Sequence, residues 1–178
     1  MSSSERKQYR FRWKDLGDVA AGRPNLGAST SIAVYRLMQY TLREVAAVRF
    51  GPETASELLV EAGRLAGTEF CRNLLDTGLD FNGFSAVLQE KLRELGIGIL
   101  RIEKADLATL EIVLTISEDL DCSGLPVTGE TVCEYDEGFL AGILQCYTGK
   151  EFTVKEVDCW ATGERTCRFE ARLKEETP

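Results

Sequence analysis

Three cysteines in the last third of the chain have the spacing expected of metal ligands. Cys159 and Cys167 lie at equal distances in sequence from Gly163. A hairpin that turns at this glycine would place their side chains opposite each other, with Cβ atoms about 4.5 to 5.5 Å apart, and two thiolates at that separation can share a tetrahedral zinc ion. Cys133 directly precedes a predicted helix that begins at Glu134, where the helix dipole favours a thiolate. The three sulfurs therefore predict a zinc site.

Glu156 is the candidate for the fourth ligand. It lies three residues before Cys159, so a regular strand would turn it to the opposite face, and the site requires a bulge near Val157 and Asp158. Four protein ligands leave no position for water, which is typical of structural rather than catalytic zinc.

Two other interpretations of these cysteines stay open. They can be small core residues, which is the usual role of free cysteine, or Cys159 and Cys167 can form a disulfide. Of the remaining cysteines, Cys71 and Cys146 fall in predicted helices and are expected in the core. Cys122, in a predicted loop, is the one plausible substitute ligand.

Composition excludes several classes of function. Without histidine, the chain cannot form a Ser-His-Asp triad, a histidine-ligated haem or an HExxH metalloprotease helix. The net charge of -8 opposes nucleic acid and anionic lipid. No apolar run approaches the roughly 18 to 20 residues of a membrane span, and no secretory signal is present. We expect a soluble, cytoplasmic protein with no catalytic residues, more plausibly a binding protein than an enzyme.

The hydrophobic pattern predicts helices that carry the first half of the chain. Helices are expected over residues 32–50, over residues 52–78 with Pro52 in the first turn, and over residues 84–95. Gly63 and Gly67 lie one turn apart on the second helix and favour close approach of another helix or a ligand.

Strands and one further helix follow. Residues 97–102 and 107–116 predict a hairpin that turns across residues 104–106, and residues 151–160 and 166–173 predict a second hairpin. Between the hairpins lies a helix over residues 134–147, with Gly149 placed to end it. This order predicts an α+β fold with an antiparallel sheet and packed helices in a single domain.

The first residues form a segment of different character. From Arg6 to Lys14, basic residues alternate with Tyr9, Phe11 and Trp13, which predicts an edge strand or docking segment, or else a partner-binding arm. We expect residues 1–21 to form this basic and aromatic segment, residues 22–173 the folded domain, and residues 174–178 a short tail.

The region around the cysteines resembles the 4-vinyl reductase domain, and it is similar to the sensory domains of phenol-responsive and xylene-responsive transcription activators. In these families three cysteines and a glutamate hold zinc, with the intervals of 22, 2 and 7 residues seen here. The resemblance implies a fold related to nitric-oxide-sensing domains and trafficking-complex subunits, a homodimer, and an apolar pocket between helices and sheet. It rests on the segment Cys133-Glu134-Tyr135-Asp136-Glu137-Gly138-Phe139-Leu140-Ala141-Gly142, on Gly149, on Glu156-Val157-Asp158-Cys159, and on Gly163 and Cys167.

These observations favour a module that binds or senses a small apolar or aromatic molecule and contains structural zinc at Cys133, Glu156, Cys159 and Cys167. By alignment of spacing, the expected pocket residues are Phe84, Ile112, Gly138, Gly142 and Val154. The alternative is an accessory subunit in reduction of a tetrapyrrole vinyl group, as in bacteriochlorophyll-type biosynthesis, although no nicotinamide, flavin or iron–sulfur motif is present. A third hypothesis is a redox switch in which thiolate oxidation ejects zinc.

Overall fold

The computed structural model describes residues 10–174, which divide into two compact units between Thr30 and Ser31. The described part of the first unit contains a 3₁₀ helix, η1 (Trp13–Leu16), and a short helix, α1 (Val19–Gly22). The predicted edge strand over Arg6 to Lys14 is therefore wrong from Arg10 onward, and residues 6–9 lie outside the described part. Asp15 accepts a hydrogen bond from the Arg12 amide, which favours a turn over an extended chain.

The second unit is built on a four-stranded antiparallel sheet. Its strands are β1 (Ile99–Asp106), β2 (Glu111–Ser117), β3 (Phe152–Asp158) and β4 (Cys167–Leu173), in the spatial order β1-β2-β4-β3. On β2, β3 and β4 every second side chain is buried, as on a sheet with one covered face. The buried row of β4 contains Cys167, Phe169 and Ala171.

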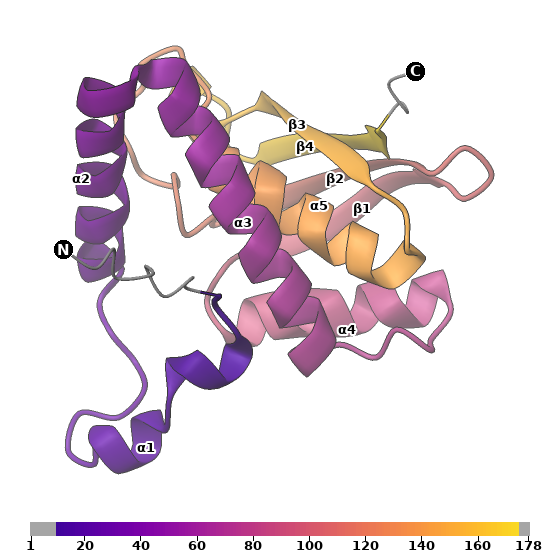
Figure 1. Ribbon diagram of the computed structural model, residues 1–178. Coiled ribbons are helices and arrows are strands. Elements are labelled where there is room, and N and C mark those ends of the chain that lie inside the picture. The colour runs from indigo at the N-terminus through magenta and orange to yellow at the C-terminus, as the bar shows by residue number, and fades with distance from the viewer. Residues whose placement is uncertain (1–9, 175–178) are drawn as a thin grey trace, which may run out of the picture. The chain divides into compact units, whose positions relative to one another are not determined.

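Four helices accompany the sheet (Figure 1). They are α2 (Ile32–Phe50), α3 (Pro52–Leu74), α4 (Phe81–Glu94) and α5 (Glu134–Thr148). Helix α5 packs on β3 and α4 packs on β1, while α3 crosses over α5 and α2 packs beside α3. The predicted α+β class, its antiparallel sheet and its main helices are confirmed.

Four glycines set the distance between α3 and α5. A Cβ atom added to Gly63 or Gly67 would overlap the backbone of α5 at Tyr135 or Phe139. A Cβ atom added to Gly138 or Gly142 would likewise overlap backbone atoms of α3. The two helices therefore meet backbone to backbone, which no residue with a side chain permits.

The first hairpin turns later than predicted. Strand β1 continues to Asp106, and residues 107–110 form the turn. The Asp106 carboxylate accepts hydrogen bonds from the amides of Ala108 and Thr109, at 2.9 and 3.2 Å, and Leu110 has a φ of 58°. The aspartate therefore begins the turn instead of ending it, as is common for a residue that mimics a backbone turn.

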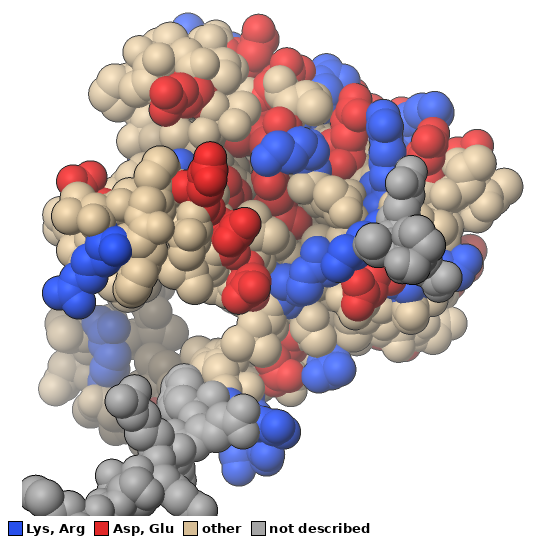
Figure 2. Space-filling view, turned by 45° about the horizontal axis from the view of Figure 1, so that its top comes forward, with Lys and Arg blue, Asp and Glu red and all other residues tan. Residues whose placement is uncertain are grey.

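The surface of the molecule carries charges of both signs. Figure 2 shows acidic and basic side chains interspersed on one face, with uncharged areas between them. Helix α2 has no buried residue, and several large apolar side chains on it are exposed. In the part of the chain from residue 10 to residue 174, no helix is long and apolar enough to cross a membrane.

Candidate metal centre

Four cysteines converge at one end of the sheet. Cys122 comes from the loop after β2, Cys133 immediately precedes α5, Cys159 follows β3, and Cys167 begins β4. All four are buried, and their sulfur atoms lie within 4.8 Å of one another. The Sγ atom of Cys133 lies 3.9 Å from the sulfurs of both Cys159 and Cys167, and the sulfurs of Cys122 and Cys167 are 3.1 Å apart. The cluster could hold a metal ion.

The distances between the sulfurs agree with a shared cation and not with disulfides. All six cysteines of the chain are free, and a disulfide needs an S–S distance of about 2.05 Å. Four thiolates around zinc, with Zn–S bonds of about 2.3 Å, stand about 3.8 Å apart. Both distances from Cys133 match this value, and the distance between Cys122 and Cys167 is shorter.

The thiols also alter the pKa values of one another. Hydrogen bonding with Cys122 raises the pKa of Cys133 and of Cys167 above the ordinary thiol range. Hydrogen bonding with Cys122 lowers the pKa of Cys159. Sulfurs this close compete for protons, and a bound cation would stabilise all four as thiolates.

A bulge and a tight turn place Cys159. The pairing of β3 with β4 shifts register between Glu156 and Asp158, so the bulge predicted near Val157 and Asp158 is confirmed. After the strand, residues 160–162 form a short 3₁₀ helix, and Gly163 turns the chain with a φ of 108°. Cys159 is fixed by its amide, which donates to the Thr162 hydroxyl at 3.1 Å. Cys159 therefore lies beyond the strand and not opposite Cys167 in the ladder.

The loop that carries Cys122 is held from two sides. The Asp119 carboxylate accepts hydrogen bonds from the amides of Asp121 and Cys122, at 2.8 and 3.1 Å. The Arg36 guanidinium, on α2, donates to the carbonyls of Leu120 and Ser123 at 2.8 and 2.9 Å. These contacts bring Cys122 to the other three sulfurs. The sequence pattern predicted it only as a substitute ligand, although the preceding aspartates are a turn signal.

Glu156 lies beside the sulfurs and contacts Cys133 through the backbone. Its Oε2 atom accepts a 3.1 Å hydrogen bond from the Cys133 amide. Its Oε1 atom is buried and has no hydrogen-bond partner within residues 10–174. Burial, followed by the charge of Cys159, raises the pKa of Glu156 to about 8. An unpartnered buried oxygen next to four sulfurs is an independent sign that a cation fits here.

The residues predicted to line a pocket occupy several places in the packed interior. Phe84, on α4, is buried and stacks on Tyr147 with ring centroids 3.9 Å apart. Ile112 and Val154 belong to the buried rows of β2 and β3. Gly138 and Gly142 lie against the backbone of α3.

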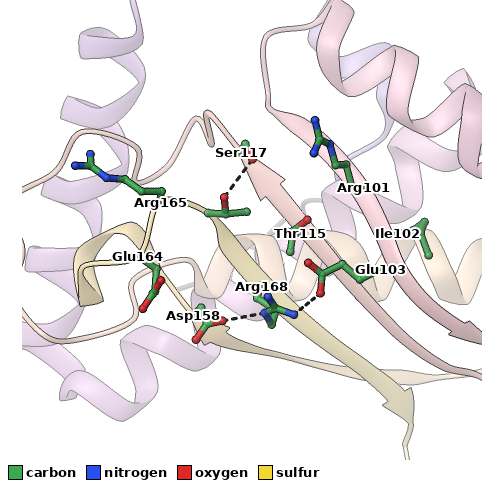
Figure 3. A pocket seen from close by; sticks show the side chains of 10 residues that line it. Arg101, Ile102, Glu103, Thr115, Ser117, Asp158, Glu164, Arg165 and Arg168 are labelled. Carbon is green, nitrogen blue, oxygen red and sulfur yellow. Dashed lines mark hydrogen bonds and ion pairs between the residues drawn. The ribbon is translucent and has the colours of Figure 1, made fainter.

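A polar hollow of about 430 Å³ lies on the sheet face opposite the cysteines (Figure 3). Arg168 donates to Asp158 at 2.9 Å and also contacts Glu103, and the hydroxyls of Ser117 and Thr166 are 3.3 Å apart. Three carboxylates offset the three guanidiniums of the lining, so the hollow has no net charge. It is lined by Arg101, Ile102, Glu103, Thr115, Ser117, Asp158, Glu164, Arg165, Thr166 and Arg168.

Comparison with known proteins identifies the region that contains all four cysteines of the cluster. Residues 112–173 match the model of the vinyl-4-reductase domain, which confirms the resemblance to the 4-vinyl reductase family. Among known sequences, the uncharacterized protein MJ1642 of Methanocaldococcus jannaschii is 29% identical over 149 residues, covering 83% of this chain and 81% of the relative.

Solved structures share the fold at low sequence identity. The phenol-responsive sensory domain of the transcription activator PoxR, solved with phenol, has a TM-score of 0.63 at 16% identity and covers 81% of this chain and 75% of its own. Trafficking protein particle complex subunit 3 from Naegleria fowleri, covalently bound to palmitic acid, has a TM-score of 0.59 at 12% identity, covering 82% and 98%. An H-NOX protein from S. oneidensis has a TM-score of 0.54 at 17% identity, covering 83% and 78%. The predicted relation to trafficking and nitric-oxide-sensing folds is confirmed.

Proposed function

We propose that this chain, whose residues 112–173 match the vinyl-4-reductase domain, is a sensory module that binds a small apolar or aromatic molecule and contains one structural zinc ion. The convergence of four buried sulfurs is the observation that carries the zinc. The likeness of the fold to a sensory domain solved with phenol and to a subunit bound to palmitic acid supports the apolar ligand.

Cys133, Cys159 and Cys167 are the three ligands common to the sequence prediction and to the sulfur cluster. Cys122 supplies the fourth donor, because its sulfur lies within the cluster, whereas Glu156 uses Oε2 to accept a hydrogen bond from Cys133. Glu156 is then a positioning residue and the alternative fourth ligand. Zinc with four protein ligands has no open position for substrate, so it serves stability.

The proposed zinc ion links three parts of the chain that are distant in sequence. Its ligands belong to the loop after β2, the start of α5, and the hairpin of β3 and β4. Bound zinc would supply a cross-link between them, and the chain provides the hydrogen bonds that orient the ligands: the Thr162 hydroxyl at Cys159 and the Asp119 carboxylate at Cys122.

The ligand pocket is proposed between α4, α5 and the sheet, at Phe84, Ile112 and Val154. These apolar side chains face one interior, and Gly138 and Gly142 allow α5 to lie deep under α3. The stacked rings of Phe84 and Tyr147 stand between α4 and α5, so an aromatic ligand entering there would replace one stacking partner of the pair.

A homodimer is the further element of this proposal. Leu42 on α2 is 60% exposed and Val48 is 76% exposed, although apolar side chains of this size are usually covered. A second copy that lays its own α2 against this face would cover both sets. The apolar face of α2 comprises Ile32, Val34, Leu37, Met38, Leu42, Val45, Val48 and Phe50. We place the dimer in the cytoplasm, where reduced thiols are maintained.

Native mass spectrometry of the purified protein tests the proposal directly. One zinc ion or more per chain is expected, together with a retained apolar molecule or a mass shift on addition of phenol. The Cys159→Ser variant is expected to lose zinc, while the matched Cys146→Ser variant, outside the cluster, retains it. Protein that carries no metal after expression with zinc would overturn the metal part, and failure to bind phenols or fatty acids would overturn the ligand part.

A further inference from the structure

A second group of metal-binding side chains adjoins the four sulfurs. Asp119, Cys133 and Asp136 each offer one ligand atom, and these three atoms lie within 4.8 Å of one another. All three residues are at least 95% buried. The Oδ2 atom of Asp136 is buried with no hydrogen-bond partner in the described part of the chain. An unpartnered carboxylate oxygen in such a position is costly unless a cation or a proton satisfies it.

The charge around the sulfurs exceeds what one zinc ion neutralises. Four thiolates and one divalent ion leave a formal charge of -2. Four buried carboxylates surround them: Asp119, Asp121, Asp136 and Glu156. Asp121 has neutral partners, the Tyr35 hydroxyl at 2.8 Å and the Gln39 amide at 2.6 Å. The nearby Arg36 donates its hydrogen bonds to backbone carbonyls of the loop. Negative charge therefore accumulates in a region that water does not reach.

The backbone presents the three donors in a fixed arrangement. Asp119 uses Oδ1 for two loop amides, which leaves its other oxygen for a ligand. Asp136 lies in the first turn of α5, three residues after Cys133, and this spacing places the two side chains on one side of the helix start. Thiolate and carboxylate together are a donor set that zinc accepts.

We propose that Asp119, Asp136 and Cys133 hold a second divalent metal ion of the class that zinc represents, with the Cys133 thiolate shared between this ion and the one bound by the four cysteines. The proposal rests on the proposed zinc at the sulfur cluster, and it turns a single structural ion into a pair. The second ion neutralises the carboxylates of Asp119 and Asp136, which form no ion pair with a cationic side chain among residues 10–174.

Metal counting on the full chain tests this proposal. Wild-type protein loaded with zinc and freed of excess metal is expected to carry two zinc ions per chain by native mass spectrometry and elemental analysis. Asp136→Asn and Asp119→Asn are each expected to lose one of the two ions and to keep the other. The matched control is Glu137→Gln, which removes a buried carboxylate from the same turn of α5, where it has Lys155 as a partner. The control is expected to keep both ions.

Other results separate the two proposals. One zinc ion in the wild type, unchanged in Asp136→Asn, would overturn the second site and leave the cysteine site intact. No zinc in the wild type would overturn the cysteine site itself. Should the asparagine variants fail to fold, a cobalt titration of metal-free wild type decides: two binding steps support the pair, and a single step at one equivalent refutes it.

Discussion

The amide of Cys133 donates a 3.1 Å hydrogen bond to Oε2 of Glu156, so the carboxylate grips the backbone of a candidate ligand residue. This relationship fixes the start of α5 against β3. It also distinguishes two roles for Glu156, positioning residue or metal ligand, and each has its own experimental signature.

Replacing Glu156 with glutamine tests that distinction. The side chain keeps an oxygen that can accept from the Cys133 amide, so we expect zinc to be retained with an affinity reduced by about 10 to 100-fold, as for groups that orient ligands. Cys122→Ser is the comparison, and it is expected to weaken zinc binding more. Competition with a chromophoric chelator measures both. The reverse ranking would make Glu156 the fourth ligand.

Removal of the metal should lower thermal stability strongly. Structural zinc can contribute on the order of 10 kcal/mol in small domains, and here it would join the loop of Cys122 to α5 and to the hairpin. We expect the melting temperature to fall on treatment with a strong chelator and to recover when zinc is returned. An identical melting curve before and after verified metal removal would show that the cluster contributes nothing to stability.

The metal-free protein should be less stable at pH 8 than at pH 5. Burial raises the pKa of Glu156 to about 8 and that of Asp119 to about 7. The folded state therefore binds more protons than the unfolded state between about pH 4.5 and pH 8, and its stability falls as the pH rises through this range. Urea denaturation at several pH values measures the trend. With zinc bound, the trend should weaken or reverse, because metal binding requires deprotonated ligands.

Adding one methyl group at the crossing of α3 and α5 should destabilise the fold. Gly138→Ala forces a Cβ atom into the backbone of α3, and we expect a loss of about 2 to 3 kcal/mol by urea denaturation. Gly22→Ala on α1 is the control, because no atom lies within 4 Å of its added Cβ, and alanine there should be neutral or slightly stabilising. Equal effects at both glycines would contradict a backbone contact.

A charge on the apolar face of α2 should separate the proposed dimer. We expect Leu42→Glu to shift the protein from dimer to monomer in size-exclusion chromatography with light scattering. Leu107→Glu is the control, since Leu107 is also exposed, at 56%, but lies in the turn between β1 and β2. A wild-type protein that is already monomeric at micromolar concentration would refute the dimer.

Much of the fold follows from local signals in the sequence. The periodicity of residues 32–50 matches α2, Pro52 begins α3, and Gly149 ends α5 in a left-handed conformation. The bulge between Glu156 and Asp158 was predictable because the ligand spacing required it. These features depend on residues close together in the chain, so the sequence contains their cause.

Features that depend on distant contacts were harder to predict. Cys122 reaches the cluster because Arg36, on another element, holds its loop by the backbone carbonyls. No spacing rule relates residues 36 and 122. The turn after Asp106 was displaced because aspartate can begin a turn as well as follow a strand, and sequence pattern alone does not choose between these. The burial of Asp119 and Asp136 was also missed, since acidic residues normally lie at the surface.

Helix α2 is attached to the sulfur cluster by its inner side. Arg36 holds the carbonyls around Cys122, and Tyr35 and Gln39 hold Asp121. The outer side of the same helix is the apolar face, so whatever binds there presses on the part that positions one sulfur. Association between copies and metal affinity would then be thermodynamically linked, and each would change the other by the same factor.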